Sequence, residues 1–161
     1  MHHKYLKIIG FFLATLIVIF LAVVYLKPDK YKNISSLNQL DEFGFLNGTQ
    51  IDTMILMKSY DDATWIVIDD KEMINEMVRY LNELNIDFDY YKSMKGTVGG
   101  GGWVTVFKIG ESEHSISYLK NSNKIFIHGY YYSILSEKSD NPFQRLYNEG
   151  REKYGVTSPW K

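Results

Sequence analysis

An uncharged stretch near the start of the chain restricts its architecture more than any other feature. Residues 8–26 are 19 consecutive residues without a charge, rich in Ile, Leu, Val and Phe. At about 1.5 Å per residue, a helix of this length spans the roughly 30 Å hydrocarbon core of a bilayer. A cleaved signal peptide has a shorter apolar region and a small-x-small site, whereas here Phe20 stands two positions before Ala22. The sequence therefore predicts an uncleaved transmembrane anchor, preceded by a short basic N-terminus (residues 1–7) and followed by a linker (residues 27–35).

The lysines on either side of the anchor bear on its orientation. Lys4 and Lys7 precede it, and Lys27, Lys30 and Lys32 follow it, so the positive-inside rule alone does not decide. A short basic start directly before an apolar stretch is typical of a signal sequence, which favours a cytoplasmic N-terminus. We therefore expect a single-pass protein with the lipid bilayer as one partner and the C-terminal domain outside the cytoplasm.

Charge and composition exclude several classes of function. From residue 33 onward the chain carries 13 Lys and Arg against 18 Asp and Glu, and this acidic balance argues against nucleic acid as a partner. The chain has no cysteine, which excludes disulfides, thiolate nucleophiles and cysteine-ligated metal sites. We expect no cofactor.

Hydrophobic periodicity predicts one α+β domain over residues 36–161. Alternating apolar residues between turn signals predict six strands, at residues 51–58, 64–68, 103–109, 114–119, 124–128 and 130–135. The first two form a hairpin and the last four a meander, so we expect a mainly antiparallel sheet of about six strands. His128-Gly129 is the expected tight turn before the last strand, and residues 85–102 are expected to form a loop.

Capping signals predict helices that pack on this sheet. Asp69 and Glu72 match a capping box, with Ile68 and Met73 as a hydrophobic staple, at the start of an amphipathic helix. A C-terminal helix is expected from Asn141, where Pro142 and Gln144 complete the signal, to Gly155. A shorter helix is expected over residues 36–43.

Candidate catalytic groups are sparse. The glycine-rich residues 96–102 lead into a strand at Trp103, whereas a phosphate-binding loop leads into a helix. They are therefore a connector or a ligand-gating loop. His114 and His128, with Glu113, form at most a weak metal or acid–base pair. The acidic turn residues do not have calcium-loop spacing, and we assign no catalytic, cofactor-binding or metal-binding residue.

Aromatic residues give the strongest indication of a binding surface. Strand alternation sends Tyr130 and Tyr132 to one face of the sheet and Tyr131 to the other, so one of these faces is expected to be exposed. The candidate interaction surface comprises Tyr90, Tyr91, Trp103, Tyr130 and Tyr132, because Tyr and Trp are favoured at interfaces. The alternative is that these side chains form cross-strand pairs that only stabilise the sheet.

A resemblance to other proteins rests on two segments. These are residues 66–72 (Ile-Val-Ile-Asp-Asp-Lys-Glu), where a strand ends and a helix begins, and the later tyrosine-rich hairpin. Over about residues 50–135 the chain resembles uncharacterised membrane-anchored extracytoplasmic α+β domains of low-GC Gram-positive bacteria. The resemblance implies a location at the cell envelope, and no catalytic residues are carried over from it.

Three functions remain open at this stage. The first is a non-catalytic binding or regulatory domain for a protein, peptide or glycan of the cell envelope. The second is a cell-envelope enzyme that uses His114, His128 or the acidic turn residues. The third is a structural or immunity partner of another membrane protein, acting through its transmembrane helix.

Overall fold

The computed structural model describes residues 30–48, 50–59, 64–91, 101–136 and 140–157. The chain divides into two units, residues 1–32 and residues 33–161, and all the described helices and strands belong to the second. Within the described part of the chain, no helix combines the length and the apolarity needed to cross a bilayer. The predicted anchor, residues 8–26, lies outside the described residues.

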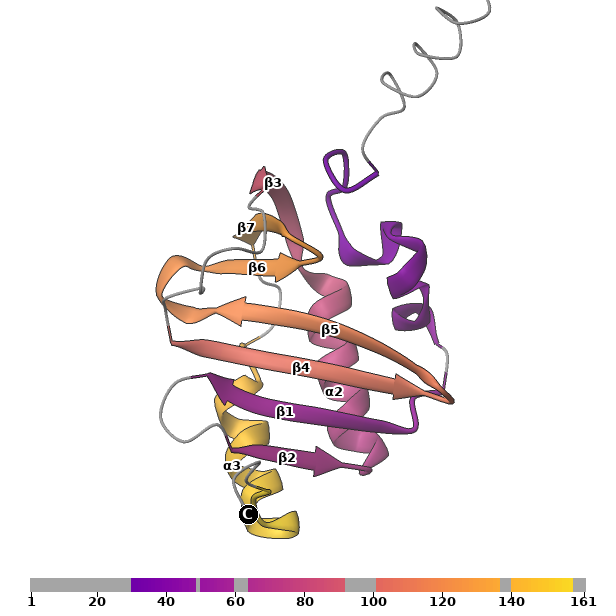
Figure 1. The fold of residues 1–161 in the computed structure, drawn as a ribbon, viewed down its shortest axis with the longest axis vertical. Coiled ribbons are helices and arrows are strands. Elements are labelled where there is room, and N and C mark those ends of the chain that lie inside the picture. The colour runs from indigo at the N-terminus through magenta and orange to yellow at the C-terminus, as the bar shows by residue number, and fades with distance from the viewer. Residues whose placement is uncertain (1–29, 49, 60–63, 92–100, 137–139, 158–161) are drawn as a thin grey trace, which may run out of the picture. The chain divides into compact units, whose positions relative to one another are not determined.

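The domain is built on one seven-stranded sheet whose pairings are all antiparallel (Figure 1). Its strand order is β2-β1-β4-β5-β6-β7-β3. The strands are β1 (Thr53–Ser59), β2 (Trp65–Ile68), β3 (Asn85–Tyr91), β4 (Gly102–Ile109), β5 (Ser112–Leu119), β6 (Lys124–Ile127) and β7 (Tyr130–Ser136). This confirms the α+β class and the antiparallel sheet, with one strand more than expected.

Two α-helices lie on the same face of the sheet (Figure 1). They are α2 (Lys71–Glu83) and α3 (Phe143–Tyr154), and three short 3-10 helices accompany them: η1 (Leu37–Gln39), η2 (Asp41–Asn47) and η3 (Lys120–Ser122). Phe143 of α3 joins the layers, because its ring stacks on Tyr118 of β5 at 4.9 Å and meets Tyr80 of α2 edge-on at 5.9 Å. The core therefore lies between the sheet and these two helices.

The two faces of the sheet differ in burial. In β4, Trp103, Thr105 and Phe107 are buried, whereas Val104 and Val106 are half-buried. The buried residues share the face that carries α2 and α3, since side chains alternate along a strand. No described helix lies over the other face, which is turned toward the viewer in Figure 1.

The seventh strand, β3, is a correction to the first part of the expected loop at residues 85–102, of which residues 92–100 lie outside the described residues. Its residues 85–89 alternate between exposed and more buried positions: Ile86 is buried, while Asp87 and Asp89 are exposed. The acidic residues made this stretch resemble a turn, but they occupy one side of an edge strand that pairs with β7. Two register shifts interrupt that pairing, between Asn85 and Ile86 and between Phe88 and Tyr90.

The other edge of the sheet is covered by the chain itself. Beyond α3, the N–H of Thr157 donates to the carbonyl of Trp65 at 2.9 Å, and the Trp65 N–H donates to the Thr157 carbonyl at 3.0 Å. This isolated bridge occupies the outward-facing backbone groups at the start of β2.

The helix ends follow the expected signals with small shifts. The N-cap of α2 is Asp70 and not Asp69, because the Asp70 side chain accepts hydrogen bonds from the backbone N–H groups of Glu72 and Met73. Helix α3 begins at Phe143, two residues after Asn141, and ends at Gly155 as expected, where φ is +74°. Asn141 caps this helix as expected, because its side-chain oxygen accepts a hydrogen bond from the N–H of Phe143 at 3.1 Å. Gln144 does not complete a capping box, since its side chain donates to Asn148.

Two local expectations have different outcomes. The tight turn at His128-Gly129 is confirmed, because both residues adopt positive φ angles. The single short helix expected over residues 36–43 is instead the pair η1 and η2, and the second continues past Gly44 to Asn47.

Candidate functional site

The structure does not bring the five predicted aromatic residues together on an exposed surface. Trp103 is only 4% exposed and Tyr132 is fully buried, so neither is available to a partner. Trp103 lies under α3, where its ring meets Tyr147 at 5.1 Å. Tyr130 is half-buried, and the side chains of Tyr90 and Tyr91 lie outside the described ones. The expectation of an exposed tyrosine face is wrong as well, since Tyr131 is 3% exposed and packs on Phe126 at 4.7 Å.

The two domain histidines both lie beside η2. The ring of His114 packs on Phe45 at 4.9 Å, and His128 Nε2 lies 3.8 Å from a carboxylate oxygen of Glu42. Glu113 does not join them. Because adjacent residues of a strand point to opposite faces, its side chain lies across the sheet from His114, in an ion pair with Lys108 at 2.9 Å.

The acidic turn residues that the structure describes have structural partners or are exposed to solvent. Asp70 caps α2, and Asp89 forms an ion pair with Lys124. Asp69 and Asp87 are exposed, and Asp61 and Asp62 lie outside the described residues. Within the described parts of the chain, no three His, Asp or Glu side chains are grouped so that they could hold a metal ion.

A group of apolar side chains on the helix-free face is the feature that sequence reasoning missed. We call it the sheet patch, and it lies on three neighbouring strands, two residues on each. The register of β2, β1 and β4 places Met57 between Trp65 and Val104, and Ile55 between Val67 and Val106. Five of these side chains are half-buried and Val67 is 44% exposed. The sheet patch comprises Ile55, Met57, Trp65, Val67, Val104 and Val106.

The sequence contained a signal for this patch. An antiparallel strand with one solvent-exposed face alternates between apolar and polar residues, whereas a strand covered on both faces is apolar at successive positions. Residues 54–57 read Met-Ile-Leu-Met and residues 65–68 read Trp-Ile-Val-Ile, which is the second pattern. By contrast, β5 places Ser115 and Ser117 on this face. The apolar character thus exceeds what α2 and α3 alone require.

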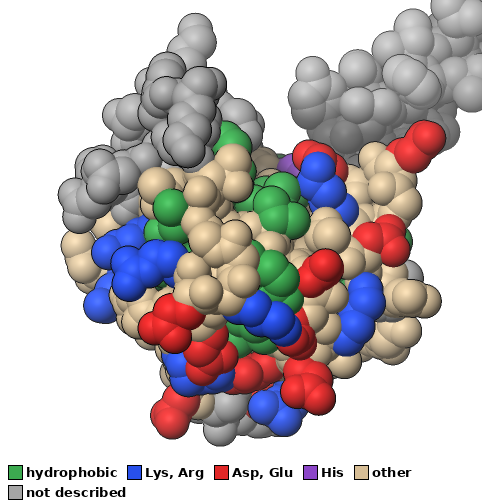
Figure 2. All heavy atoms as spheres, turned by 90° about the horizontal axis from the view of Figure 1, so that it is seen from below, with side chains coloured by type: hydrophobic (Ala, Val, Ile, Leu, Met, Phe, Trp, Pro, Cys, Tyr) green, Lys and Arg blue, Asp and Glu red, His purple; other side chains and the backbone are tan. Residues whose placement is uncertain are grey.

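Two ion pairs within the chain neutralise lysine charges on this face. Lys108 pairs with Glu113 across β4 and β5, and Lys124 pairs with Asp89 near the other edge. The sheet patch itself carries no charge. Figure 2 views the domain from below, where β2 and α3 lie in Figure 1. In this view, hydrophobic side chains reach the surface between groups of acidic and basic ones.

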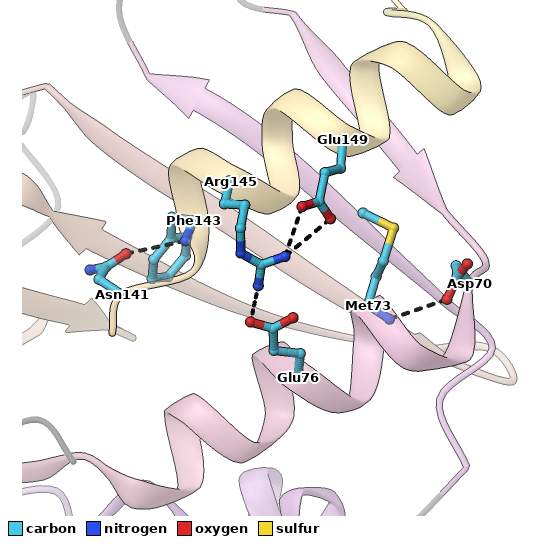
Figure 3. Close-up of polar contacts among 7 residues, drawn as sticks. All are labelled: Asp70, Met73, Glu76, Asn141, Phe143, Arg145 and Glu149. Carbon is cyan, nitrogen blue, oxygen red and sulfur yellow. Dashed lines mark hydrogen bonds and ion pairs between the residues drawn. The ribbon is translucent and has the colours of Figure 1, made fainter. Parts of the chain in front are cut away.

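Polar contacts fasten the helices on the opposite face. Arg145 of α3 forms ion pairs with Glu76 of α2 and, at 2.9 Å, with Glu149 of its own helix (Figure 3). The hydrogen bond with Glu76 is the main reason why the pKa of Arg145 is raised. Together with Phe143, these contacts hold α3 against α2 and the sheet, so the helix layer forms a fixed support beneath the patch.

A second ion pair links the C-terminal end of α3 to the start of α2. Lys153 Nζ donates to Asp70 at 2.6 Å. This contact lowers the pKa of the Asp70 carboxyl and raises the pKa of Lys153 to about 12.

Comparison of the chain with protein-family models, with curated proteins and with solved structures found no match.

Proposed function

We propose that this chain is a non-catalytic binding domain, held at a membrane by residues 8–26 and displayed outside the cytoplasm, which binds a protein partner through the sheet patch. The observation that carries the proposal is the six-residue apolar patch on the face without a described helix. Contiguous apolar patches larger than a few hundred Å² are uncommon on monomeric proteins and often mark interaction sites.

The dimensions and charge of the patch indicate the kind of partner. Three strands about 4.8 Å apart present a band roughly 14 Å wide, which matches the roughly 10–12 Å diameter of one α-helix with its side chains. The charges of Lys108 and Lys124 are already neutralised within the chain, so an acidic or basic partner would gain little. The partner that fits is a helix with an apolar stripe, which would give this sheet a second helix layer.

Photo-crosslinking in membranes tests this proposal. A photoreactive phenylalanine analogue replaces Val67 or Val104 in the full chain, and Asn148, exposed on α3, is the control position. We expect one discrete adduct from both patch positions and none from Asn148. Mass spectrometry of the adduct is expected to identify a partner segment with apolar residues at helical spacing.

A substitution in the patch completes the experiment. Met57→Lys places a charge at the centre of the patch and is expected to reduce adduct formation at Val104 at least tenfold, while the fold is retained because Met57 is only half-buried. An adduct of two copies of this chain, an adduct with lipid alone, or equal labelling from Asn148 would each overturn the proposal.

The enzyme alternative makes a different prediction. Neither His114 nor His128 belongs to the sheet patch, so replacing both by alanine is expected to leave crosslinking from Val67 unchanged. Suppose that the double variant stays folded and keeps crosslinking but no longer replaces the native chain in cells. The histidines would then take part in a reaction, and the proposal of a non-catalytic domain would be contradicted.

A further inference from the structure

Met57 occupies the centre of the sheet patch. The register of β1 places it between Trp65 of β2 and Val104 of β4. The Cβ atoms of directly opposed residues on neighbouring antiparallel strands are about 5 Å apart, so Met57 has an apolar neighbour on each side. A helix that covers the patch, as proposed above, would therefore lie on the Met57 side chain.

Met57 is also more accessible than the other methionines that the structure describes. It is half-buried on the helix-free face, whereas Met54 and Met77 are fully buried and Met73 is 9% exposed. The chain has no cysteine, so methionine is its only sulfur-containing residue. Since exposure governs which sulfur a dissolved oxidant reaches, such a reagent meets Met57 before the other three.

A hydroperoxide converts a methionine thioether into a sulfoxide. A lone pair of the sulfur attacks one peroxide oxygen, an S–O bond forms and the O–O bond breaks. The sulfur loses two electrons, and with hydrogen peroxide the second oxygen leaves with both protons as water. The side chain changes from flexible and apolar to polar, and its new oxygen accepts hydrogen bonds.

We propose that oxidation of Met57 by a hydroperoxide switches the sheet patch from a binding to a non-binding state. In the free domain the sulfoxide oxygen stays hydrated, because Met57 is only half-buried and no described helix lies over this face (Figure 1). Beneath a partner helix the same oxygen would lose its water and meet apolar side chains that donate no hydrogen bond, which opposes binding.

This switch rests on the proposed protein-binding function and regulates the same surface. The space outside the cytoplasm, where we propose that the domain lies, is an oxidising one. A chain without cysteine cannot respond to oxidants there through thiols or disulfides. A methionine at the centre of the binding surface supplies such a response.

Treatment of the full chain in lipid nanodiscs with hydrogen peroxide tests whether Met57 is the reactive site. Fragmentation mass spectrometry of proteolytic peptides measures the sulfoxide at each methionine. Met57 is expected to oxidise at least about tenfold faster than Met54 and Met77, which are internal controls in the same sample. Equal rates at Met57 and Met54 would overturn the proposal.

Photo-crosslinking from Val67 in membranes then measures binding before and after oxidation. In the native chain, peroxide is expected to reduce adduct formation at least about tenfold. Methionine sulfoxide reductases A and B, which together reduce both sulfoxide epimers, are expected to restore it. Met57→Leu keeps an apolar side chain of similar volume, so its adduct is expected to form at the native level and to persist in peroxide.

The outcomes distinguish this switch from the function on which it rests. Absence of an adduct from the untreated native chain would contradict protein binding through the sheet patch and would overturn the switch as well. An adduct that persists when Met57 is fully oxidised would overturn the switch alone. Loss of the adduct in peroxide-treated Met57→Leu would also overturn it, because the sensitive group would then be another residue of the chain or of its partner.

Discussion

Gly102 lies where two strands approach too closely for any side chain. A Cβ atom at this position would lie 2.1 Å from the backbone carbonyl oxygen of Tyr118, so β4 and β5 would have to separate. We expect Gly102→Ala to lower the free energy of unfolding by about 2–3 kcal/mol. A Cβ atom added at the adjacent Gly101 would have no atom within 4 Å, so Gly101→Ala is the control and should change stability by less than about 0.5 kcal/mol. Urea unfolding followed by circular dichroism measures both, and equal effects would contradict the argument.

Thr105 places a polar hydroxyl group inside the core. It is fully buried in β4, and within the described residues its hydroxyl has no hydrogen-bond partner. Valine has nearly the same shape and removes the unsatisfied group, so Thr105→Val is expected to raise the free energy of unfolding by about 1 kcal/mol. Thr105→Ser keeps the hydroxyl and loses the methyl group, so it should destabilise. Urea unfolding measures both variants, and a stabilising Ser variant would show that the hydroxyl is not the cause.

Individual side chains were harder to place from the sequence than the strands that carry them. The strand containing Trp103 was predicted, but the face on which its ring lies depends on where α3 packs, and sequence spacing does not give that contact. The same holds for Tyr132, which is buried although tyrosine is common at interfaces. The sheet patch could not be inferred from aromatic residues, because five of its six members are aliphatic.

At the scale of elements, Asp70 connects the two α-helices. Its carboxylate caps α2 and accepts a hydrogen bond from Lys153 of α3. The pKa of Asp70 is lowered on folding, mainly by Lys153, so its contribution to stability is present above the unfolded value near pH 4 and is lost as pH falls through the folded pKa. Asn caps a helix as well as Asp, so Asp70→Asn isolates the charge.

We therefore expect Asp70→Asn to be less stable than the native chain at pH 7, with the difference closing below about pH 4. Thermal unfolding between pH 2 and pH 7 measures this, and Asp69→Asn is the matched control because Asp69 is exposed and does not cap the helix. A difference between Asp70→Asn and the native chain that does not change with pH would rule out the carboxylate charge as the cause.

Helices and strands could be predicted where the sequence pattern within one segment agreed with the packing of that segment in the fold. The amphipathic pattern of α2 and the glycine end of α3 are local, and both expectations were confirmed. Strand β3 depends on its pairing with β7, which is distant in sequence, so its acidic residues appeared to form a loop. The one-residue error at the start of α2 arose because two adjacent aspartates offer equivalent caps.

At the scale of the whole molecule, the location of the domain is the property that most needs measurement. With residues 8–26 as an anchor, we expect the chain to stay in the membrane fraction after carbonate extraction. Protease added to intact cells is expected to degrade the C-terminal domain. A tag on the N-terminus should be protected in the same cells. Release by carbonate would contradict the anchor, and a domain cleaved only after lysis would reverse the orientation.

The fold class followed from the sequence, because periodicity and capping act within short windows. The candidate site did not, because it depends on which face of the sheet the described helices leave uncovered, and that is decided by contacts between segments distant in sequence. The consecutive apolar residues of β1 and β2 were the sequence feature that indicated a further layer on the second face of the sheet.

The two edge strands of the sheet limit how copies of this domain can assemble. Thr157 occupies the start of β2, and β3 carries Asp87 and Asp89 along a strand with two register shifts. An open, flat edge would let strands add one after another into a filament, whereas a bridged edge at one end and an irregular, acidic edge at the other oppose such growth. Copies of this domain would therefore remain discrete, and their apolar faces could be reserved for a partner without the risk of fibre formation.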